Sequence, residues 1–334
     1  MSRQFIELRG RLRAVSPVMT ALVVGVLVVG AGCSDGGGNS GGAPQEEAAE
    51  EVSALLVAHR GASAYAPEHT LAAYELAIDQ GADYVEPDLQ ITRDGVLIAL
   101  HDLTLNRTTD VELVFPDRFR VDTVRGESVH RWYANDFDLE EILRLDAGAW
   151  FGEEFAGARV PLFSEVIDVV RGRAGIFAET KAPEVYGDRG FDMERLVLLE
   201  LSQHGLDRPG ADPDTPIVIQ SFSAASLRIL RDELGTELPL TYLISGPDAE
   251  DWLSAEGLIR VRAFATGIAP TKSLLVDRPE VVARAHDAGL TVIPWTFGAS
   301  RTDQFDSLRE EMARFLVDLG VDGLITNNPD LFPR

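Results

Sequence analysis

The sequence predicts an α/β chain that folds as a (β/α)8 barrel, the TIM barrel, with a small insertion. From Val52 onward, short apolar runs alternate with amphipathic helical patterns, and such alternation builds parallel strands joined by right-handed crossovers. About 280 residues shared among eight units give about 35 each, which suits a barrel of about 250 residues plus an insertion. Residues 104–159 interrupt the alternation with polar, aromatic and turn-forming residues, so we predict the insertion there. A doubly wound open sheet is the competing architecture.

The first β/α unit shows how the elements are assigned. The apolar run at 55–59 predicts a short buried strand. Apolar residues then recur at helical spacing from 71 to 78 behind Thr70, a typical N-cap, and Gly81 ends the helix. The same reasoning predicts strands at 84–89, 96–100, 176–179, 217–221, 240–244, 264–268, 291–295 and 323–326. It predicts helices at 163–170, 192–204, 224–234, 280–288 and 305–319.

Residues 1–32 have the composition of a signal peptide. Four arginines precede an apolar run at 18–31, and about 14 residues are too few to span a bilayer comfortably as a helix. The run ends in Val-Gly-Ala-Gly-Cys33, which resembles a bacterial lipobox and implies that Cys33 is lipidated and becomes the mature N-terminus. The alternative is an uncleaved anchor with an incidental cysteine. Both interpretations place the rest of the chain outside the cytoplasm, and lipidation implies attachment to a bacterial membrane.

The composition of the chain argues against several classes of partner and binding site. Residues 33–51 are rich in Gly and then in Glu, which predicts a flexible tether before a barrel domain at 52–334. The formal charge is −24, with 54 acidic and 30 basic side chains, and this argues against a nucleic-acid partner. A single cysteine permits neither an intrachain disulfide nor a cysteine-based zinc site. Only Lys181 and Lys272 are lysines, against 28 arginines, so each lysine stands out.

Acidic side chains stand at the predicted ends of two strands. Glu86 and Asp88 are two residues apart, so on a strand they share one face, and Pro87 between them is typical of a ladder that ends. Glu179 ends another strand, with Lys181 two residues later. Three carboxylates converging at a barrel rim repel one another unless a hard cation such as Mg²⁺ or Ca²⁺ lies among them. Taken one at a time, each acid is also typical of a solvated loop.

Basic and imidazole groups accompany these acids. A compact ammonium at Lys181 favours a point-charge contact to phosphate, although a surface charge is the simpler alternative. His59 and His101 each end a predicted strand and precede a charged residue, which suits an acid and base pair on opposite sides of a substrate. Asp102 would favour a protonated His101 if the side chains meet, so we predict His101 as the general acid and His59 as the general base. The other histidines are interpreted as structural: His69, His130, His204 and His286.

The same residues lie in motifs with a specific order and spacing over about 45 residues. These are His59-Arg60-Gly61-Ala62, Pro67-Glu68-His69-Thr70, Glu86-Pro87-Asp88, Thr92-Arg93-Asp94-Gly95 and His101-Asp102. Together they resemble the glycerophosphodiester phosphodiesterase family. Weaker matches continue to the end of the domain, at Glu179-Thr180-Lys181, Gln220-Ser221-Phe222, Trp295-Thr296 and Asp322-Gly323-Leu324-Ile325-Thr326.

The resemblance implies a TIM barrel that uses one divalent metal ion and two histidines to hydrolyse a small glycerophosphodiester to glycerol 3-phosphate and an alcohol. By position it implies metal ligands at Glu86, Asp88 and Glu179, an acid/base pair at His59 and His101, and phosphate contacts at Arg60 and Lys181. His69 replaces the family's usual Asn and Asn327 a usual Asp, and both departures bear on substrate contacts. The resemblance does not settle the oligomeric state or the alcohol released.

Three other functions compete with this hypothesis. A phospholipase D-like lyase shares the barrel and the paired histidines, but such enzymes resemble disulfide-bearing chains and this one has a single cysteine; the reaction products discriminate. A lipoprotein that binds glycerophosphodiesters without hydrolysing them is a second alternative, and a single turnover assay distinguishes it from an enzyme. A structural envelope protein has no use for inward-facing carboxylates.

Overall fold

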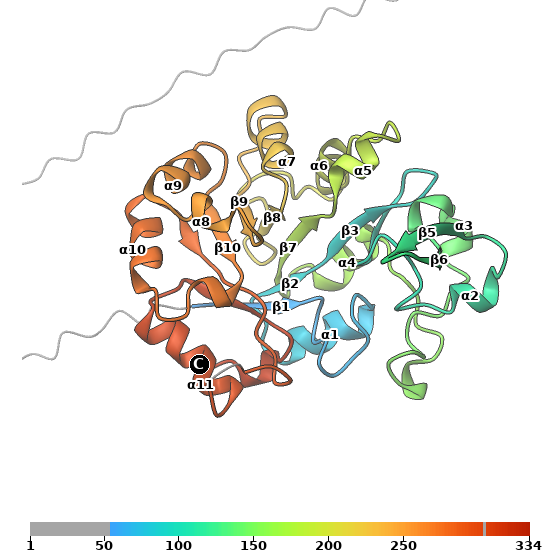
Figure 1. Ribbon diagram of the computed structural model, residues 1–334, viewed down its shortest axis with the longest axis horizontal. Coiled ribbons are helices and arrows are strands. Elements are labelled where there is room, and N and C mark those ends of the chain that lie inside the picture. Colours follow the sequence, from blue (N-terminus) through green and yellow to red (C-terminus); the bar gives the residue numbers. More distant parts are fainter. Residues whose placement is uncertain (1–53, 303–304) are drawn as a thin grey trace, which may run out of the picture. The chain divides into compact units, whose positions relative to one another are not determined.

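The computed structural model describes residues 54–302 and 305–334, and within these ranges eight parallel strands form a nearly closed barrel with helices between them (Figure 1). The predicted (β/α)8 architecture is confirmed. The strands pair in the order β11-β10-β9-β8-β7-β2-β1-β12. They are β1 (Leu55–His59), β2 (Tyr84–Glu86), β7 (Gly175–Thr180), β8 (Ile217–Ser221), β9 (Leu240–Ile244), β10 (Gly267–Pro270), β11 (Thr291–Val292) and β12 (Gly323–Thr326).

The barrel closes between β12 and the chain that continues from β11. Pro294 has no N–H to donate across this seam, and the Val292 amide donates to the Asp322 carboxylate instead. Backbone donors of the β12 side therefore supply much of the closure: Asp322 N–H donates to Val292 O at 2.9 Å and Ile325 N–H to Pro294 O at 3.0 Å. Phe297 N–H then donates to Ile325 O at 2.9 Å. The proline explains why β11 is the shortest barrel strand.

Helices pack around the outside of the strands (Figure 1). Several begin at a side chain that caps the first turn, as Thr70 does by accepting a hydrogen bond from Ala73 N–H. The connecting helices are α1 (Leu71–Asp79), α4 (Phe163–Val170), α6 (Met193–Gln203), α7 (Ala224–Arg228) with the π turn η3 (Ile229–Glu233), α9 (Ala255–Arg262), α10 (Pro279–Asp287), and α11 (Leu308–Ala313) with the π turn η5 (Arg314–Asp318). Shorter pieces are α5 (Pro183–Gly187), α8 (Ala249–Trp252), η4 (Lys272–Leu274) and η6 (Pro329–Leu331).

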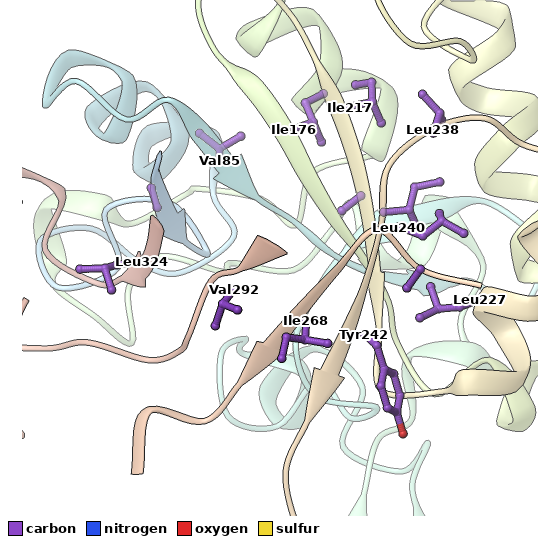
Figure 2. Packing of buried hydrophobic residues seen from close by; sticks show 14 of the residues in the cluster. Val85, Ile176, Ile217, Leu227, Leu238, Leu240, Tyr242, Ile268, Val292 and Leu324 are labelled. Atoms are coloured by element: carbon purple, nitrogen blue, oxygen red, sulfur yellow. The ribbon is translucent and has the colours of Figure 1, made fainter. Parts of the chain in front are cut away.

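Apolar side chains form two layers because alternate residues of a strand point to opposite faces. The interior cluster of the barrel contains Val57, Phe177, Val218, Leu243, Ala269, Ile293 and Ile325. Neighbouring strand residues belong to the larger cluster under the helices, which includes Val85, Ile176, Ile217, Leu240, Ile268, Val292 and Leu324 (Figure 2). This double packing holds the strand ends rigidly, which is what a site at the rim requires.

Two of the predicted strands differ from the structure in how they are divided or paired. The run at 84–89 is divided at Pro87, so that β3 (Asp88–Ile91) begins as a separate strand beside β7. The run at 96–100 forms β4 (Leu97–Ala99), which pairs antiparallel with β3 and is not a barrel strand. A tight turn with Gly95 at φ 87° joins β3 to β4. A short apolar run predicts a strand without specifying its partner, and the turn decides the pairing here.

Residues 104–159 form a compact segment with its own apolar core. The segment contains η1 (Ala134–Asp136), η2 (Glu153–Phe155), α2 (Val111–Val114), α3 (Leu139–Ile142) and an antiparallel hairpin of β5 (Arg120–Val124) and β6 (Glu127–Arg131). Its buried side chains pack with Ile98 and Leu100 of the β3–β4 hairpin; they include Leu105, Val111, Trp132, Phe137 and Ile142. The segment is thus anchored on the loop that carries His101.

The predicted signal peptide at 1–32, Cys33 and the tether at 33–51 lie outside the described residues. Within the described ranges, none of the helices has both the length and the apolar character needed to cross a membrane.

Candidate active site

Six of the seven predicted site residues surround one cavity of about 120 Å³ at the carboxyl ends of the strands. The seventh, Asp88, is buried against the other carboxylates at the start of β3. The cavity is lined by His59, Arg60, Glu86, His101, Glu179 and Lys181, together with the apolar side chains of Phe222, Leu243 and Trp295. The seven predicted residues therefore come from five separate strands and loops that meet at one rim.

The carboxylates of Glu86, Asp88 and Glu179 converge in this site. One oxygen of each lies within 4.8 Å of the other two, and all three side chains are buried. Asp88 pairs in register with Glu179 of the neighbouring parallel strand β7, while His59 at the end of β1 is in register with Glu86. The two-residue spacing brings the first two acids together, and the strand register adds the third.

Burial shifts the protonation of this triad, and the neighbouring cations offset the shift only at Asp88. Burial, followed by the charge of Asp88, raises the pKa of Glu86 to about 8 and the pKa of Glu179 well above its usual range. Burial also opposes ionisation of Asp88, but Lys181 and then His69 lower its pKa well below the usual range. All three carboxyl groups can be ionised together only if another positive charge lies near them. A hard divalent cation such as Mg²⁺ or Ca²⁺, which prefers carboxylate oxygens as ligands, fits this site.

Two cations flank the triad. Lys181 Nζ lies 2.9 Å from Glu179 Oε1 and 3.6 Å from Asp88 Oδ1. Arg60 adopts a left-handed φ of 57°, which turns its backbone N–H toward Glu86 Oε2 at 3.1 Å. The Arg60 Nε atom is buried, 3.5 Å from Asp88 Oδ2, and has no hydrogen-bond partner among the described residues. Because an unsatisfied buried donor is costly, this atom fits an anionic oxygen brought by a ligand.

The two histidines have different partners. His59 Nδ1 lies 2.6 Å from Asn327 Oδ1, and its Nε2 lies 3.9 Å from Glu86 Oε2. Burial, and then the charge of Arg60, lowers the pKa of His59 to about 3, so the neutral ring donates Nδ1–H to Asn327 and keeps a lone pair on Nε2. His101 Nδ1 lies 2.6 Å from Asp102 Oδ1, which leaves Nε2 of this ring for the cavity. The pair thus offers a neutral imidazole and a carboxylate-bound one.

Comparison with known proteins identifies the family. A model of the glycerophosphoryl diester phosphodiesterase family matches residues 59–331, a range that includes the whole cavity. The chain belongs to this family. It is 34% identical over 288 residues to a glycerophosphodiester phosphodiesterase of Bacillus subtilis, covering 84% of this chain and 85% of that one. It is 31% identical over 287 residues to one of Caldanaerobacter subterraneus, covering 83% of this chain and 95% of that one.

Solved structures of family members agree with this assignment. A glycerophosphodiester phosphodiesterase of Agrobacterium tumefaciens superimposes with a TM-score of 0.61 at 28% identity, covering 84% of this chain and 98% of that chain. A phosphodiesterase of Oleispira antarctica, solved with the product sn-glycerol-3-phosphate, superimposes with a TM-score of 0.64 at 25% identity, covering 83% and 94%. The protein is therefore a phosphoric diester hydrolase on a TIM barrel.

Several side chains outside the predicted set of site residues support this hydrolase site. Gln220 Nε2 donates to Glu86 Oε1 at 2.6 Å. His69 is almost fully buried and bridges Asp88 Oδ2 and the Tyr74 hydroxyl, each at 2.8 Å from a ring nitrogen. The sequence predicts a structural role for His69, and these contacts make it a partner of a candidate metal ligand. The motif Gln220-Ser221-Phe222 marks the glutamine in the sequence, and the register of β7 with β8, which pairs Glu179 with Gln220, brings it to the carboxylates.

The remaining histidines and the second lysine lie outside this cavity. His130 stacks on Phe119 with ring centroids 3.6 Å apart, and His286 contacts Asp322 at 2.9 Å. Lys272 Nζ is buried and donates to Glu311 Oε1 at 2.6 Å and to the Arg301 carbonyl at 2.9 Å. Of the two lysines, Lys181 alone therefore lines the site.

Proposed function

We propose that the protein hydrolyses glycerophosphodiesters to glycerol 3-phosphate and an alcohol, with a divalent metal ion and with His59 and His101 as the proton-transfer pair. The observation that carries the proposal is the convergence of three buried carboxylates, two imidazoles and two cations on one cavity. The product complex of the Oleispira antarctica neighbour supports a small phosphate-bearing ligand in a cavity of this family.

Arg60 and Lys181 would bind the phosphodiester. Both lie beside Asp88, with Arg60 Nε 3.5 Å from Oδ2 and Lys181 Nζ 3.6 Å from Oδ1, and the buried Arg60 Nε has no hydrogen-bond partner among the described residues. With a divalent cation, the three carboxylates sum to −1, and the two cations bring the site to +1. That charge favours a phosphodiester monoanion despite the acidic chain.

Glu86, Asp88 and Glu179 would hold the metal ion, because their oxygens lie within reach of one point and prefer a hard cation. When bound, such an ion supplies a positive charge that polarises a phosphoryl oxygen and orients the nucleophile. His69 and Gln220 would fix the orientation of Asp88 and Glu86 through their hydrogen bonds. Either Mg²⁺ or Ca²⁺ fits this donor set.

The histidines would divide the proton transfer. His59 is neutral and holds its Nδ1–H on Asn327, so its Nε2 would accept the proton of the nucleophile, either water or the glycerol hydroxyl of the substrate. His101, bound to Asp102 through Nδ1, would deliver a proton from Nε2 to the leaving alkoxide. Imidazoles in these roles contribute typically ~10² to 10⁴-fold in rate.

The test is to incubate the metal-loaded protein with glycerophosphocholine and identify the products by phosphorus NMR and by enzymatic assays. We expect glycerol 3-phosphate and choline. Accumulation of a cyclic glycerophosphate as the final product would indicate a lyase instead. Binding of the substrate with no turnover at any tested metal would indicate a binding protein and would overturn the proposal.

We also propose that Cys33 is lipidated and holds the enzyme outside the cytoplasm on a bacterial membrane. The support is the sequence alone: an arginine-rich start, an apolar run and a lipobox-like Gly-Ala-Gly-Cys33. Two or more acyl chains on one cysteine suffice for stable attachment. The tether at 33–51 would then separate the barrel from the bilayer.

A further inference from the structure

A chain of alternating charges connects His101 with Arg60, two residues that line the cavity. At its centre, Arg107 donates from Nε to Asp102 Oδ2 at 2.7 Å and from its two terminal nitrogens to both oxygens of Glu68, at 2.8 and 2.7 Å. All three nitrogen atoms of the guanidinium are used. The fork with Glu68 is the bidentate geometry that only arginine provides.

Each carboxylate that Arg107 binds also contacts a residue of the proposed mechanism. The second oxygen of Asp102 contacts His101 Nδ1 at 2.6 Å. Glu68 Oε1 also accepts a hydrogen bond from Arg60 at 3.0 Å. Burial opposes ionisation of Glu68, but hydrogen bonds from Arg107 and the charge of Arg60 lower its pKa to about 2, so this link is charged at neutral pH.

The backbone that carries Arg107 is firmly held. Arg107 lies in the first turn of the segment 104–159, and Leu105 N–H donates to Trp132 O at 2.8 Å. Asn106 Oδ1 accepts from Trp132 N–H at 3.1 Å. These contacts tie the turn to the core of the segment rather than to the barrel. The side chain then reaches back to Glu68 in the first loop of the barrel.

We propose that Arg107 is a positioning residue that sets the placement of both His101 and Arg60, so that the segment 104–159 contributes to catalysis through it. The proposal rests on the proposed roles of His101 and Arg60. Without the guanidinium, Asp102 and Glu68 would face each other without the cation between them, and like charges repel. Asp102 would then no longer hold the His101 ring in one orientation, and Glu68 would draw Arg60 away from the phosphate.

The test uses Arg107→Met and Arg107→Lys with two substrates, glycerophosphocholine and a nitrophenyl phosphodiester. Glycerophosphocholine needs a protonated leaving group, whereas nitrophenolate departs without one. For Arg107→Met we expect KM to rise about tenfold on both substrates, and kcat to fall on the order of 10²-fold only on glycerophosphocholine, as misplaced groups do. Arg107→Lys keeps the positive charge but loses the bidentate contact with Glu68. We therefore expect its KM to lie nearer the wild-type value than its kcat does.

Arg118→Met is the matched control. Arg118 belongs to the same segment, has a similar exposure of 35% against 42% for Arg107, and pairs with Glu141 away from the cavity. We expect it to leave KM and kcat on both substrates within about twofold, because most surface pairs contribute little. A loss of kcat by the same factor on both substrates in Arg107→Met, matched by a lower folded fraction, would assign Arg107 to stability and overturn the proposal.

A double mutant separates this proposal from the proposed function. If Arg107 acts through His101, Arg107→Met adds no further loss of kcat on glycerophosphocholine in the His101→Ala background. If His101→Ala is impaired while Arg107→Met keeps wild-type kcat and KM, the positioning role is wrong and the acid role of His101 stands. If His101→Ala itself keeps full kcat, the acid role is wrong and the positioning proposal falls with it.

Discussion

Replacing Glu179 by Gln should weaken metal binding far more than any change to a solvated acid nearby. The substitution keeps the shape of the side chain and removes one negative charge from a group of carboxylate oxygens that lie within 4.8 Å of one another. A cation held among these oxygens lies closer than that to Glu179, so the attraction lost with one unit charge is at least about 3 kcal/mol at an effective dielectric constant of about 20. Because 1.36 kcal/mol is tenfold, we expect the dissociation constant for Mg²⁺ or Ca²⁺ to rise on the order of 10²-fold.

The measurement is calorimetric titration of the metal-free protein, with Glu184→Gln as the control. Glu184 is exposed in α5 and accepts a hydrogen bond from Ser223, so its removal should change the dissociation constant by less than about twofold. Activity at subsaturating metal should follow the same order. If Glu179→Gln binds the metal as tightly as the wild type, the assignment of the triad as the metal site is wrong.

Three further outcomes follow from the same account. His101→Ala should lose about 10²-fold or more on glycerophosphocholine but keep much of its rate on a nitrophenyl phosphodiester, whereas His59→Ala should lose on both; rescue of His59→Ala by the activated substrate would reverse the roles. Cys33→Ser should move the protein from the membrane to the soluble or precursor fraction, and unchanged partitioning of a correctly cleaved mutant would refute lipidation. Gly61→Ala should destabilise the protein by about 2 kcal/mol or more in denaturant titration, because φ is +83° and the new Cβ would lie 2.6 Å from the Ala73 carbonyl carbon; a stability equal to wild type would contradict this packing.

Local signals in the sequence predict much of the barrel. The first strand (β1) and α4 have the predicted bounds, and Thr70 caps α1 as predicted. Such elements depend on residues that are near one another in the chain, so the sequence alone is enough to predict them. The strand predicted at 264–268 instead begins at Gly267, because Phe264 N–H and Ala265 N–H bond back to Val261 at the end of α9. Apolar character alone does not distinguish the last turn of a helix from the start of the next strand.

In the candidate site, too, the sequence predicts contacts between near neighbours in the chain but not those between distant residues. The sequence predicts that Glu86 and Asp88 meet, because two-residue spacing on a strand places side chains on one face. It does not predict the contacts that support the site residues. Gln220 contacts Glu86 across 134 residues of chain, and Asn327 contacts His59 across 268. Those contacts exist only once the barrel closes. The role of His69 was equally hidden, since its contact to Asp88 requires the left-handed φ of 59° in the first loop.

The most direct test of metal-dependent phosphodiester hydrolysis is to measure glycerol 3-phosphate release from glycerophosphocholine before and after removal of bound metal. Without the ion, burial favours the protonated forms of Glu86 and Glu179, and the positive charge that would polarise the phosphoryl oxygen and orient the nucleophile is missing. We predict that exhaustive chelation abolishes activity and that one equivalent of Mg²⁺ or Ca²⁺ per chain, added in slight excess, restores it. Full activity in protein whose metal content is shown to be nil would contradict the account.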